Sequence, residues 1–175
     1  MTRTSVSITA SCGCGQVAFN LKGAPILRVA CYCTSCQAAG HAFVREFGPP
    51  PVVAEDGGTD LVLYRNDRVV QITGVDRFKE YRLTTESPTR RMVATCCGTP
   101  MVMDFTKGHW LSFYRARLPE DDSVLAMRVM TRARPAAVTL PDDVPAYATR
   151  SASFMWKLLS SWAAMGFRRP PVPWQ

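Results

Sequence analysis

Short stretches in which polar and apolar residues alternate run along the first three quarters of the chain and predict β-strands. These stretches are residues 6–10, 17–21, 27–32, 61–65, 68–73, 78–84, 91–95, 110–117 and 124–130. Asn66-Asp67 separates two of them and is typical of a hairpin turn. Residues 1–132 are therefore predicted to form a mainly β domain of short antiparallel strands.

The last part of the chain breaks this alternation. Residues 133–150 contain three prolines and are predicted to form a crossing loop, and residues 151–175 a helix and tail. Within 153–165, Ser153 is the predicted N-cap and Gly166 follows the predicted end. Apolar residues recur at helical spacing at Met155, Leu158, Leu159, Trp162 and Met165. We predict that this face packs on the domain or on a second subunit in a homodimer, and that membrane contact is the less favoured alternative.

Composition narrows the class of protein. The chain has 175 residues, with 47% hydrophobic and 20% charged positions, which fits one globular domain. Its apolar stretches fall short of the ~20 residues that span a bilayer. The first residues lack the continuous apolar run of a secretion signal, so a cytoplasmic location is expected. The formal charge of +7 comes from scattered basic residues, so a nucleic-acid partner is not indicated.

The seven cysteines lie in three tight clusters. An odd number excludes a complete disulfide framework, and cysteines separated by one residue are poor disulfide partners. Thiolates are good zinc ligands, and zinc binding would also lower the positive charge of the chain. The sequence therefore predicts reduced thiols that hold one or two zinc ions per chain.

The segment Cys31-Tyr32-Cys33-Thr34-Ser35-Cys36 places three thiols within six residues. Three protein ligands leave the fourth position of a tetrahedral zinc ion open, which is typical of a reactive site. The alternative is that Cys96 or a distant residue closes the site and makes it structural.

A second predicted site contains Cys12, Cys14 and Cys97, with glycines that allow sharp turns around a metal. Cys96 is the remaining cysteine. Neighbouring residues on an extended strand point to opposite faces, so Cys96 joins Cys97 only if the chain turns there, which Gly98 permits. The alternative is that Cys96 is a small buried residue, and the sequence leaves both possibilities open.

The order of these motifs resembles the glutathione-dependent formaldehyde-activating enzyme family, which includes centromere protein V-like proteins. The resemblance rests on Ser-Cys-Gly-Cys-Gly at 11–15, Cys-x-Cys-x-x-Cys-Gln at 31–37 and Cys-Gly-Thr-Pro at 97–100. It implies a zinc-containing β-tent fold. It also implies that Cys12, Cys14 and Cys97 are structural ligands and that Cys31, Cys33 and Cys36 hold a catalytic zinc.

The implied reaction interconverts S-(hydroxymethyl)glutathione with formaldehyde and glutathione, and makes glutathione or a related small thiol the expected partner. Three departures mark a divergent member. Ala94 stands where the family usually has a cysteine, and Cys96 is additional. The loop after Cys36, which contains His41, is one residue shorter. The tail from about Ala133 matches no motif of the family.

The remaining site candidates are polar residues near the clusters in sequence. His41 is a candidate for proton transfer, and its alternative is an ordinary surface histidine. Arg28, Arg45 and Arg82 are candidates for binding the carboxylates of glutathione, and each has the alternative of a solvated surface residue. Two functions remain: a zinc-dependent carbon–sulfur lyase acting on small thiol adducts, and a non-catalytic zinc module that binds a thiol or a protein partner.

Overall fold

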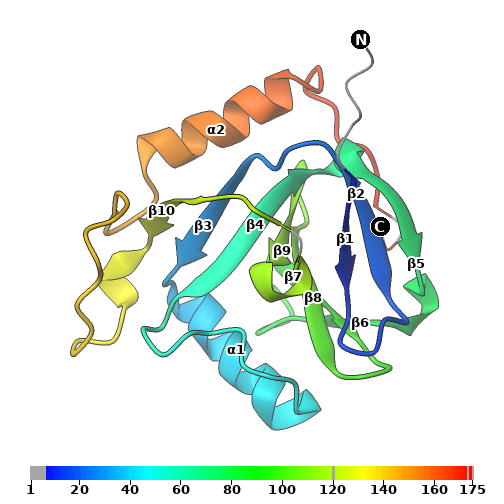
Figure 1. Cartoon of the computed structure of the whole chain (residues 1–175), viewed down its shortest axis with the longest axis horizontal. Helices are drawn as coiled ribbons and strands as arrows, with labels where there is room; N and C mark the ends of the chain where they lie inside the picture. The colour runs from blue at the N-terminus through cyan, green and yellow to red at the C-terminus, as the bar shows by residue number, and fades with distance from the viewer. Residues whose placement is uncertain (1–6, 120, 173, 175) are drawn as a thin grey trace.

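The computed structural model describes residues 7–119, 121–172 and 174, and these form ten β-strands and two α-helices (Figure 1). The strands are β1 (Ser7–Ser11), β2 (Ala18–Lys22), β3 (Leu27–Cys31), β4 (Thr59–Arg65), β5 (Val69–Thr73), β6 (Phe78–Tyr81), β7 (Thr89–Ala94), β8 (Thr99–Phe105), β9 (Trp110–Tyr114) and β10 (Leu125–Val129). The helices are α1 (Thr34–Phe47) and α2 (Ala152–Ala163). Val6, predicted to begin the first strand, lies outside the described residues. Neither described helix has the length and apolar character that a bilayer crossing requires.

The strands form two sheets, which confirms the mainly β fold with a C-terminal helix. One sheet has three strands in the order β1-β2-β5, and the other has seven in the order β10-β3-β4-β9-β8-β7-β6. All pairs are antiparallel except β3 with β10, which run parallel. The chain returns after β9 to the outer edge of β3, so a crossover replaces a hairpin and the larger sheet is mixed.

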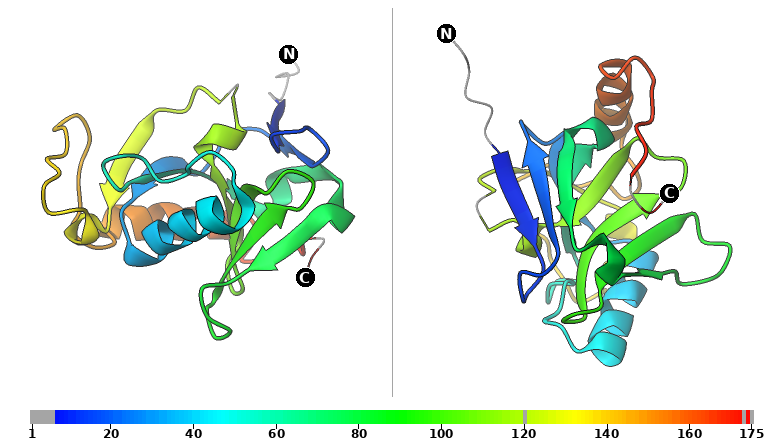
Figure 2. Two further views of the ribbon diagram at one scale, coloured as in Figure 1. Left: turned by 90° about the horizontal axis from the view of Figure 1, so that it is seen from below. Right: turned by 90° about the vertical axis from the view of Figure 1, so that its right-hand side faces the viewer.

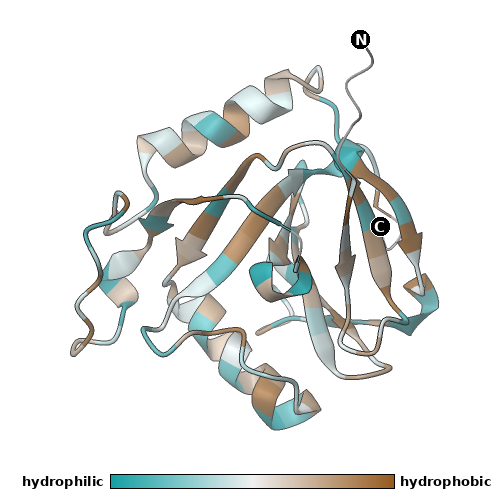
Figure 3. Ribbon diagram, viewed as in Figure 1, coloured by the Kyte–Doolittle hydropathy of each residue, from teal (hydrophilic) through white to brown (hydrophobic). Residues whose placement is uncertain are grey.

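Alternation along the strands supplies two hydrophobic clusters, one on each face of the larger sheet. On β4, Val62 and Tyr64 face the cluster shared with the small sheet, while Leu61 and Leu63 face the cluster shared with α1 and α2. The hydrophobic colour in Figure 3 covers much of strands such as β3 and β4, while the connecting loops carry mixed colours. Burial of both faces of the larger sheet fixes the strand register.

The predicted hairpin around Asn66-Asp67 is wrong. β4 and β5 do flank this point, but β5 pairs with β2 in the small sheet and β4 pairs with β3 and β9. A 3-10 turn at Asn66–Arg68 redirects the chain, and the buried Asn66 side chain donates a hydrogen bond to the carbonyl of Pro170 (3.1 Å). Tertiary contacts of the turn, rather than its local propensity, decide the partner of β5.

The loop predicted after Cys36 is also wrong, because these residues form α1. The Cys33 side chain caps the helix by accepting a hydrogen bond from the backbone N–H of Cys36, and Gly48 ends it in the left-handed conformation (φ 72°). The small residues Ala39 and Ala42 are buried against the sheet. The cap, the terminal glycine and the prolines after it are helix signals that the sequence contains. Figures 1 and 2 show α1 directly after the end of β3, so the helix begins inside the second cysteine cluster.

Helix α2 begins earlier in the chain than predicted, and fewer of its apolar side chains are buried within this chain than predicted. Its N-cap is Ser151, not Ser153, and the Ser151 hydroxyl accepts from the N–H of Phe154. Of the five apolar positions, Leu158 and Met165 are buried and Trp162 is half-buried, while Met155 and Leu159 are 49% and 46% exposed. Within one chain the domain therefore covers only the inner part of the apolar face, and burial of the outer part against a second subunit stays a prediction.

Several contacts hold the C-terminal segment on the two sheets. His109 lies within hydrogen-bond distance of the Leu158 carbonyl (2.9 Å) and stacks on Trp162. Further along, Val172 is buried between the sheets, and the Trp174 indole donates to Asp104 (3.0 Å). The tail is therefore part of the hydrophobic core and not an appendage.

We expect a chain that ends at Arg150 to be much less stable than the full chain. Truncation removes three buried side chains, Leu158, Met165 and Val172. Each such side chain contributes roughly 1.5–3 kcal/mol, so a loss of about 5 kcal/mol is expected. Urea denaturation of both zinc-loaded proteins measures the difference. Trp156→Ser is the control, since Trp156 is 67% exposed and its replacement should change little; equal stability of the full and truncated chains would contradict the expectation.

Candidate zinc centres

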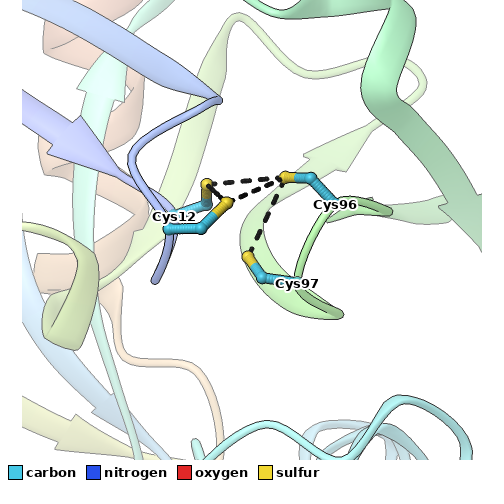
Figure 4. Close-up of side chains that lie close together, drawn as sticks. Cys12, Cys96 and Cys97 are labelled. Carbon is cyan, nitrogen blue, oxygen red and sulfur yellow. Dashed lines mark hydrogen bonds between the residues drawn. The ribbon is translucent and has the colours of Figure 1, made fainter.

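Two tight turns bring four cysteines together between the two sheets. Cys12 and Cys14 lie in the turn of the β1–β2 hairpin, and Cys96 and Cys97 in the turn of the β7–β8 hairpin. Their sulfur atoms all lie within 4.8 Å of one another. Figure 4 shows the sulfurs of Cys12, Cys96 and Cys97 directed at a common point from the two turns.

The sulfur–sulfur distances in this four-cysteine cluster fit tetrahedral zinc. Cys14 and Cys96 are 3.3 Å apart, Cys12 and Cys14 3.6 Å, Cys12 and Cys96 3.8 Å, and Cys96 and Cys97 3.9 Å. A zinc–sulfur bond of ~2.3 Å gives an edge of ~3.8 Å in a regular tetrahedron. Every described cysteine is a free thiol. The donor set and its spacing therefore suit one closed, structural zinc site.

Surrounding donors stabilise thiolates in the four-cysteine cluster. The Thr99 hydroxyl lies 3.0 Å from the sulfur of Cys97, and the backbone N–H of Val17 donates to the sulfur of Cys12 (3.3 Å). Burial opposes ionisation of Cys97, but the hydrogen bonds from Thr99 and from backbone N–H groups lower its pKa to about 6. Thr99 belongs to the Cys-Gly-Thr-Pro motif at 97–100, but the sequence alone assigned it no role at the metal site. Such outer donors orient metal ligands.

The geometry places Cys96 with the other three cysteines because the chain turns sharply there. Gly98 has a φ of +67°, and a side chain at this position would meet the carbonyl of Phe47 at 2.5 Å. Burial and the neighbouring sulfurs raise the pKa of the free Cys96 thiol to about 12. Ala94, by contrast, is fully buried in the core at the end of β7. Cys96 thus supplies a fourth sulfur where Ala94 offers none.

The second cluster contains Cys31, Cys33 and Cys36, and we refer to it as the tri-cysteine cluster. Their three sulfur atoms lie within 4.8 Å of one another, and no further histidine, cysteine or carboxylate among the described residues joins them. Cys31 ends β3, while Cys33 caps α1 and Cys36 lies in its first turn. The junction of a strand and a helix therefore gathers three ligands within six residues.

The start of α1 favours negative charge on this cluster. Hydrogen bonds from the thiols of Cys31 and Cys36, with further ones from Ser35 and the Cys36 N–H, hold the pKa of Cys33 far below its usual value. Hydrogen bonding to that sulfur raises the pKa of Cys31, and burial adds to the increase for Cys36. The free N–H groups and positive end of a helix stabilise a thiolate at this position. The donor set suits zinc and leaves one position of a tetrahedron unfilled by the described side chains.

The structure places His41 on the exposed surface of α1. It follows Cys36 by five residues in the helix, which turns its side chain by about 140° from that of Cys36. His41 and the buried Cys36 therefore point in different directions from the helix axis.

The three candidate arginines lie in separate ion pairs. Arg28 on β3 forms a bidentate pair with Asp60 (2.6 Å from Nη2 to Oδ2), and this hydrogen bond raises the pKa of the guanidinium. Arg45 on α1 is exposed and pairs with Glu46. Arg82 after β6 pairs with Glu80. None of these arginines contacts a cysteine through a hydrogen bond among the described residues, and their predicted role in substrate binding stays a prediction.

Comparison with known proteins gives a match to a protein family and matches to chains of solved structures. Residues 7–49 match the family described as glutathione-dependent formaldehyde-activating enzyme. A crystal structure of a Rhodobacter sphaeroides protein is 14% identical, covers 66% of this chain and 91% of its own, and gives a TM-score of 0.44. No curated protein matches the chain.

The matched segment contains the first two cysteine clusters in the order that the sequence analysis used for its resemblance. It covers about a quarter of the chain and stops before the β7–β8 turn, where Cys96 and Ala94 depart from the usual pattern. The match confirms, over residues 7–49, the predicted resemblance to the family described as glutathione-dependent formaldehyde-activating enzyme.

Proposed function

We propose that this protein is a zinc-dependent carbon–sulfur lyase that acts on small thiol adducts such as S-(hydroxymethyl)glutathione. The tri-cysteine cluster is the proposed reactive centre, and the four-cysteine cluster is the proposed structural one. The assignment extends the family match to a reaction and a substrate class, and it is tested by the experiment below.

The observation that carries the proposal is the difference in ligand number between the two clusters. Four sulfurs surround one position between the hairpin turns, whereas three sulfurs converge at the start of α1 with no fourth ligand among the described residues. Structural zinc sites are closed by four protein ligands, and catalytic sites keep one position for substrate. The same chain thus offers both types of donor set.

Zinc held by Cys31, Cys33 and Cys36 would acidify a thiol that binds as its fourth ligand, which makes a thiolate available at neutral pH. In the cleavage direction, the carbon–sulfur bond of the hemithioacetal breaks and its electron pair stays on sulfur. The hydroxyl oxygen loses its proton to solvent as the carbon–oxygen double bond of formaldehyde forms. The reverse sequence joins the same thiolate to formaldehyde.

Hydrogen bonds around the tri-cysteine cluster fix the position of its turn. Cys33 is held by its hydrogen bond from the N–H of Cys36 (3.4 Å) and by Ser35, whose hydroxyl lies 3.2 Å from its sulfur. Gln37 ties the same turn to the rest of the protein by donating to the carbonyls of Tyr32 (2.6 Å) and Ala133 (2.8 Å). These contacts hold the turn that carries the sulfurs, and a reactive centre needs such pre-organisation.

The test combines metal analysis with a thiol titration and exchange spectroscopy. We expect up to two zinc ions per chain in protein purified without chelator. Glutathione should bind with release of a proton as its thiol ionises. NMR exchange spectroscopy at neutral pH should show faster exchange between glutathione and its formaldehyde adduct. Metal-free protein with disulfides in these clusters would overturn the proposal.

A non-catalytic zinc module is the second candidate, and exposed apolar residues on α2 favour it. Met155, Trp156 and Leu159 are 49%, 67% and 46% exposed, which is unusual for large apolar side chains on one helix. Glutathione binding without faster exchange would favour this candidate and reject the lyase. Faster exchange that requires zinc would favour the lyase.

A further inference from the structure

Arg91 is a buried arginine without a carboxylate partner among the described residues. It is 1% exposed, and its Nε and Nη1 atoms have no hydrogen-bond partner. Its neighbour Arg90 shows the usual arrangement, since its Nη2 lies 2.5 Å from the buried carboxylate of Asp104. Two adjacent arginines on β7 are thus both buried, and only one of them has its charge balanced by an acid.

The position of Arg91 relates it to the tri-cysteine cluster. Successive side chains of a strand point to opposite faces, so Arg91 shares the face of Val93, which packs in the same cluster as Cys36. The Nη2 atom of Arg91 donates to the carbonyl of Ser35 (3.2 Å), the residue between Cys33 and Cys36. The guanidinium therefore contacts the backbone of the turn that carries two of the three sulfurs.

The buried hydroxyl of Tyr114 is influenced by both Arg91 and Cys36, and it stays neutral. Burial raises the pKa of the Tyr114 hydroxyl well above its usual value, while the charges of Arg91 and Cys36 act on it in opposite directions. A neutral phenol balances no charge. A buried cation is stable only where an anion or several hydrogen bonds compensate it. Among the described residues no carboxylate forms an ion pair with Arg91, and its guanidinium contacts the turn that carries the sulfurs of Cys33 and Cys36.

We propose that Arg91 is the buried counter-charge of the tri-cysteine zinc centre. The inference rests on the zinc site of the proposed function. Three thiolates and one divalent ion carry one net negative charge, which the guanidinium balances through the short link by Ser35. Arg91 is a positioning residue, because it acts through the turn and through its charge and does not contact the fourth ligand.

The counter-charge also bears on what the centre binds. A thiolate adds a second negative charge to the centre, whereas a neutral ligand such as imidazole adds none. A fixed cation in a region of low dielectric constant lowers the cost of the added negative charge. Arg91 therefore favours small thiolates over neutral ligands at the fourth position.

The test separates charge from hydrogen bonding with two variants of the full chain. Arg91→Lys keeps the charge, and Arg91→Gln keeps a donor for the Ser35 carbonyl without the charge. Competition with a chelator gives the zinc affinity of each protein. The Cys33→Ser variant lacks the zinc of the tri-cysteine cluster, so the phase of zinc release that it lacks is the one that belongs to this cluster. We expect the affinity of this phase to fall by roughly 10- to 100-fold in Arg91→Gln, as for other outer partners of metal ligands, and to stay near the original value in Arg91→Lys.

A second measurement compares 2-mercaptoethanol with imidazole as added ligands of the cobalt-substituted proteins, followed by their visible spectra. Arg91→Gln should lose preference for the thiolate, and Arg91→Lys should keep it. Equal zinc affinity in Arg91→Gln and the unchanged protein would overturn the inference. So would an Arg91→Lys protein as impaired as Arg91→Gln, which would indicate a purely structural role. These readouts need no turnover, so failure of the lyase reaction alone would leave them intact.

Discussion

Cys96→Ser is expected to remove about one equivalent of zinc and to lower the free energy of unfolding by several kcal/mol. The four-cysteine cluster joins the β1–β2 turn to the β7–β8 turn, and no other covalent or ionic link between these turns occurs among the described residues. Structural zinc contributes roughly 10–16 kcal/mol of binding free energy in small zinc-binding peptides, and a domain with its own core depends on only part of it. Urea denaturation and metal analysis measure both effects.

The Cys96→Ser experiment has two comparisons. Cys97→Ser should be equally damaging, because both sulfurs belong to one tetrahedral set. Thr95→Ala changes an exposed residue of the same turn and should keep both zinc and stability. A Cys96→Ser protein that retains its zinc and its stability would show that Cys96 is only a small buried residue, and that three ligands suffice at this site.

Cys33→Ser is expected to abolish glutathione binding and to lower the rate of adduct exchange to that of the uncatalysed reaction. The sulfur of Cys33 caps α1 and is the thiol with the most strongly lowered pKa in its cluster. A serine hydroxyl keeps the helix cap but is a poor zinc ligand. One equivalent of zinc should therefore be lost while the fold remains. NMR exchange spectroscopy and metal analysis report the two effects.

The control for Cys33→Ser is Ser35→Ala, which removes a hydroxyl 3.2 Å from the same sulfur and leaves all three thiols. It should retain zinc and most of the exchange activity. If Cys33→Ser retained full exchange activity, the tri-cysteine cluster would not be the reactive centre. A protein that loses zinc but also unfolds would instead assign a structural role to the cluster.

The sequence was most informative where local chemistry decides the structure. Alternation placed most strands within a few residues, because each strand buries one or both of its faces against a core. The spacing of Cys31, Cys33 and Cys36 identified a potential metal site without any knowledge of the fold, since three thiols so close in sequence are close in space. Helix α1 stands where the sequence predicted a loop, although its N-cap at Cys33 and its terminal Gly48 are local signals.

Other features depend on segments far apart in the chain. The turn at Asn66–Arg68 has hairpin propensity, yet β5 pairs with β2, because burial of Asn66 against the C-terminal tail redirects the strand. The outer part of α2 is exposed although its apolar spacing predicts burial, since spacing defines a face but not what covers it.

The two cysteine clusters show the same difference between what the sequence and the tertiary structure decide. By itself the sequence determined the thiol chemistry, the three clusters of cysteines, and the motif order on which the family resemblance rests. Only the tertiary structure decided that Cys96 joins Cys12, Cys14 and Cys97, since this requires two hairpin turns from opposite parts of the chain to meet. It also decided that the buried charge of Arg91 lies against the tri-cysteine turn. Charge balance and metal coordination act through space, and a linear pattern does not encode which distant residues come within reach.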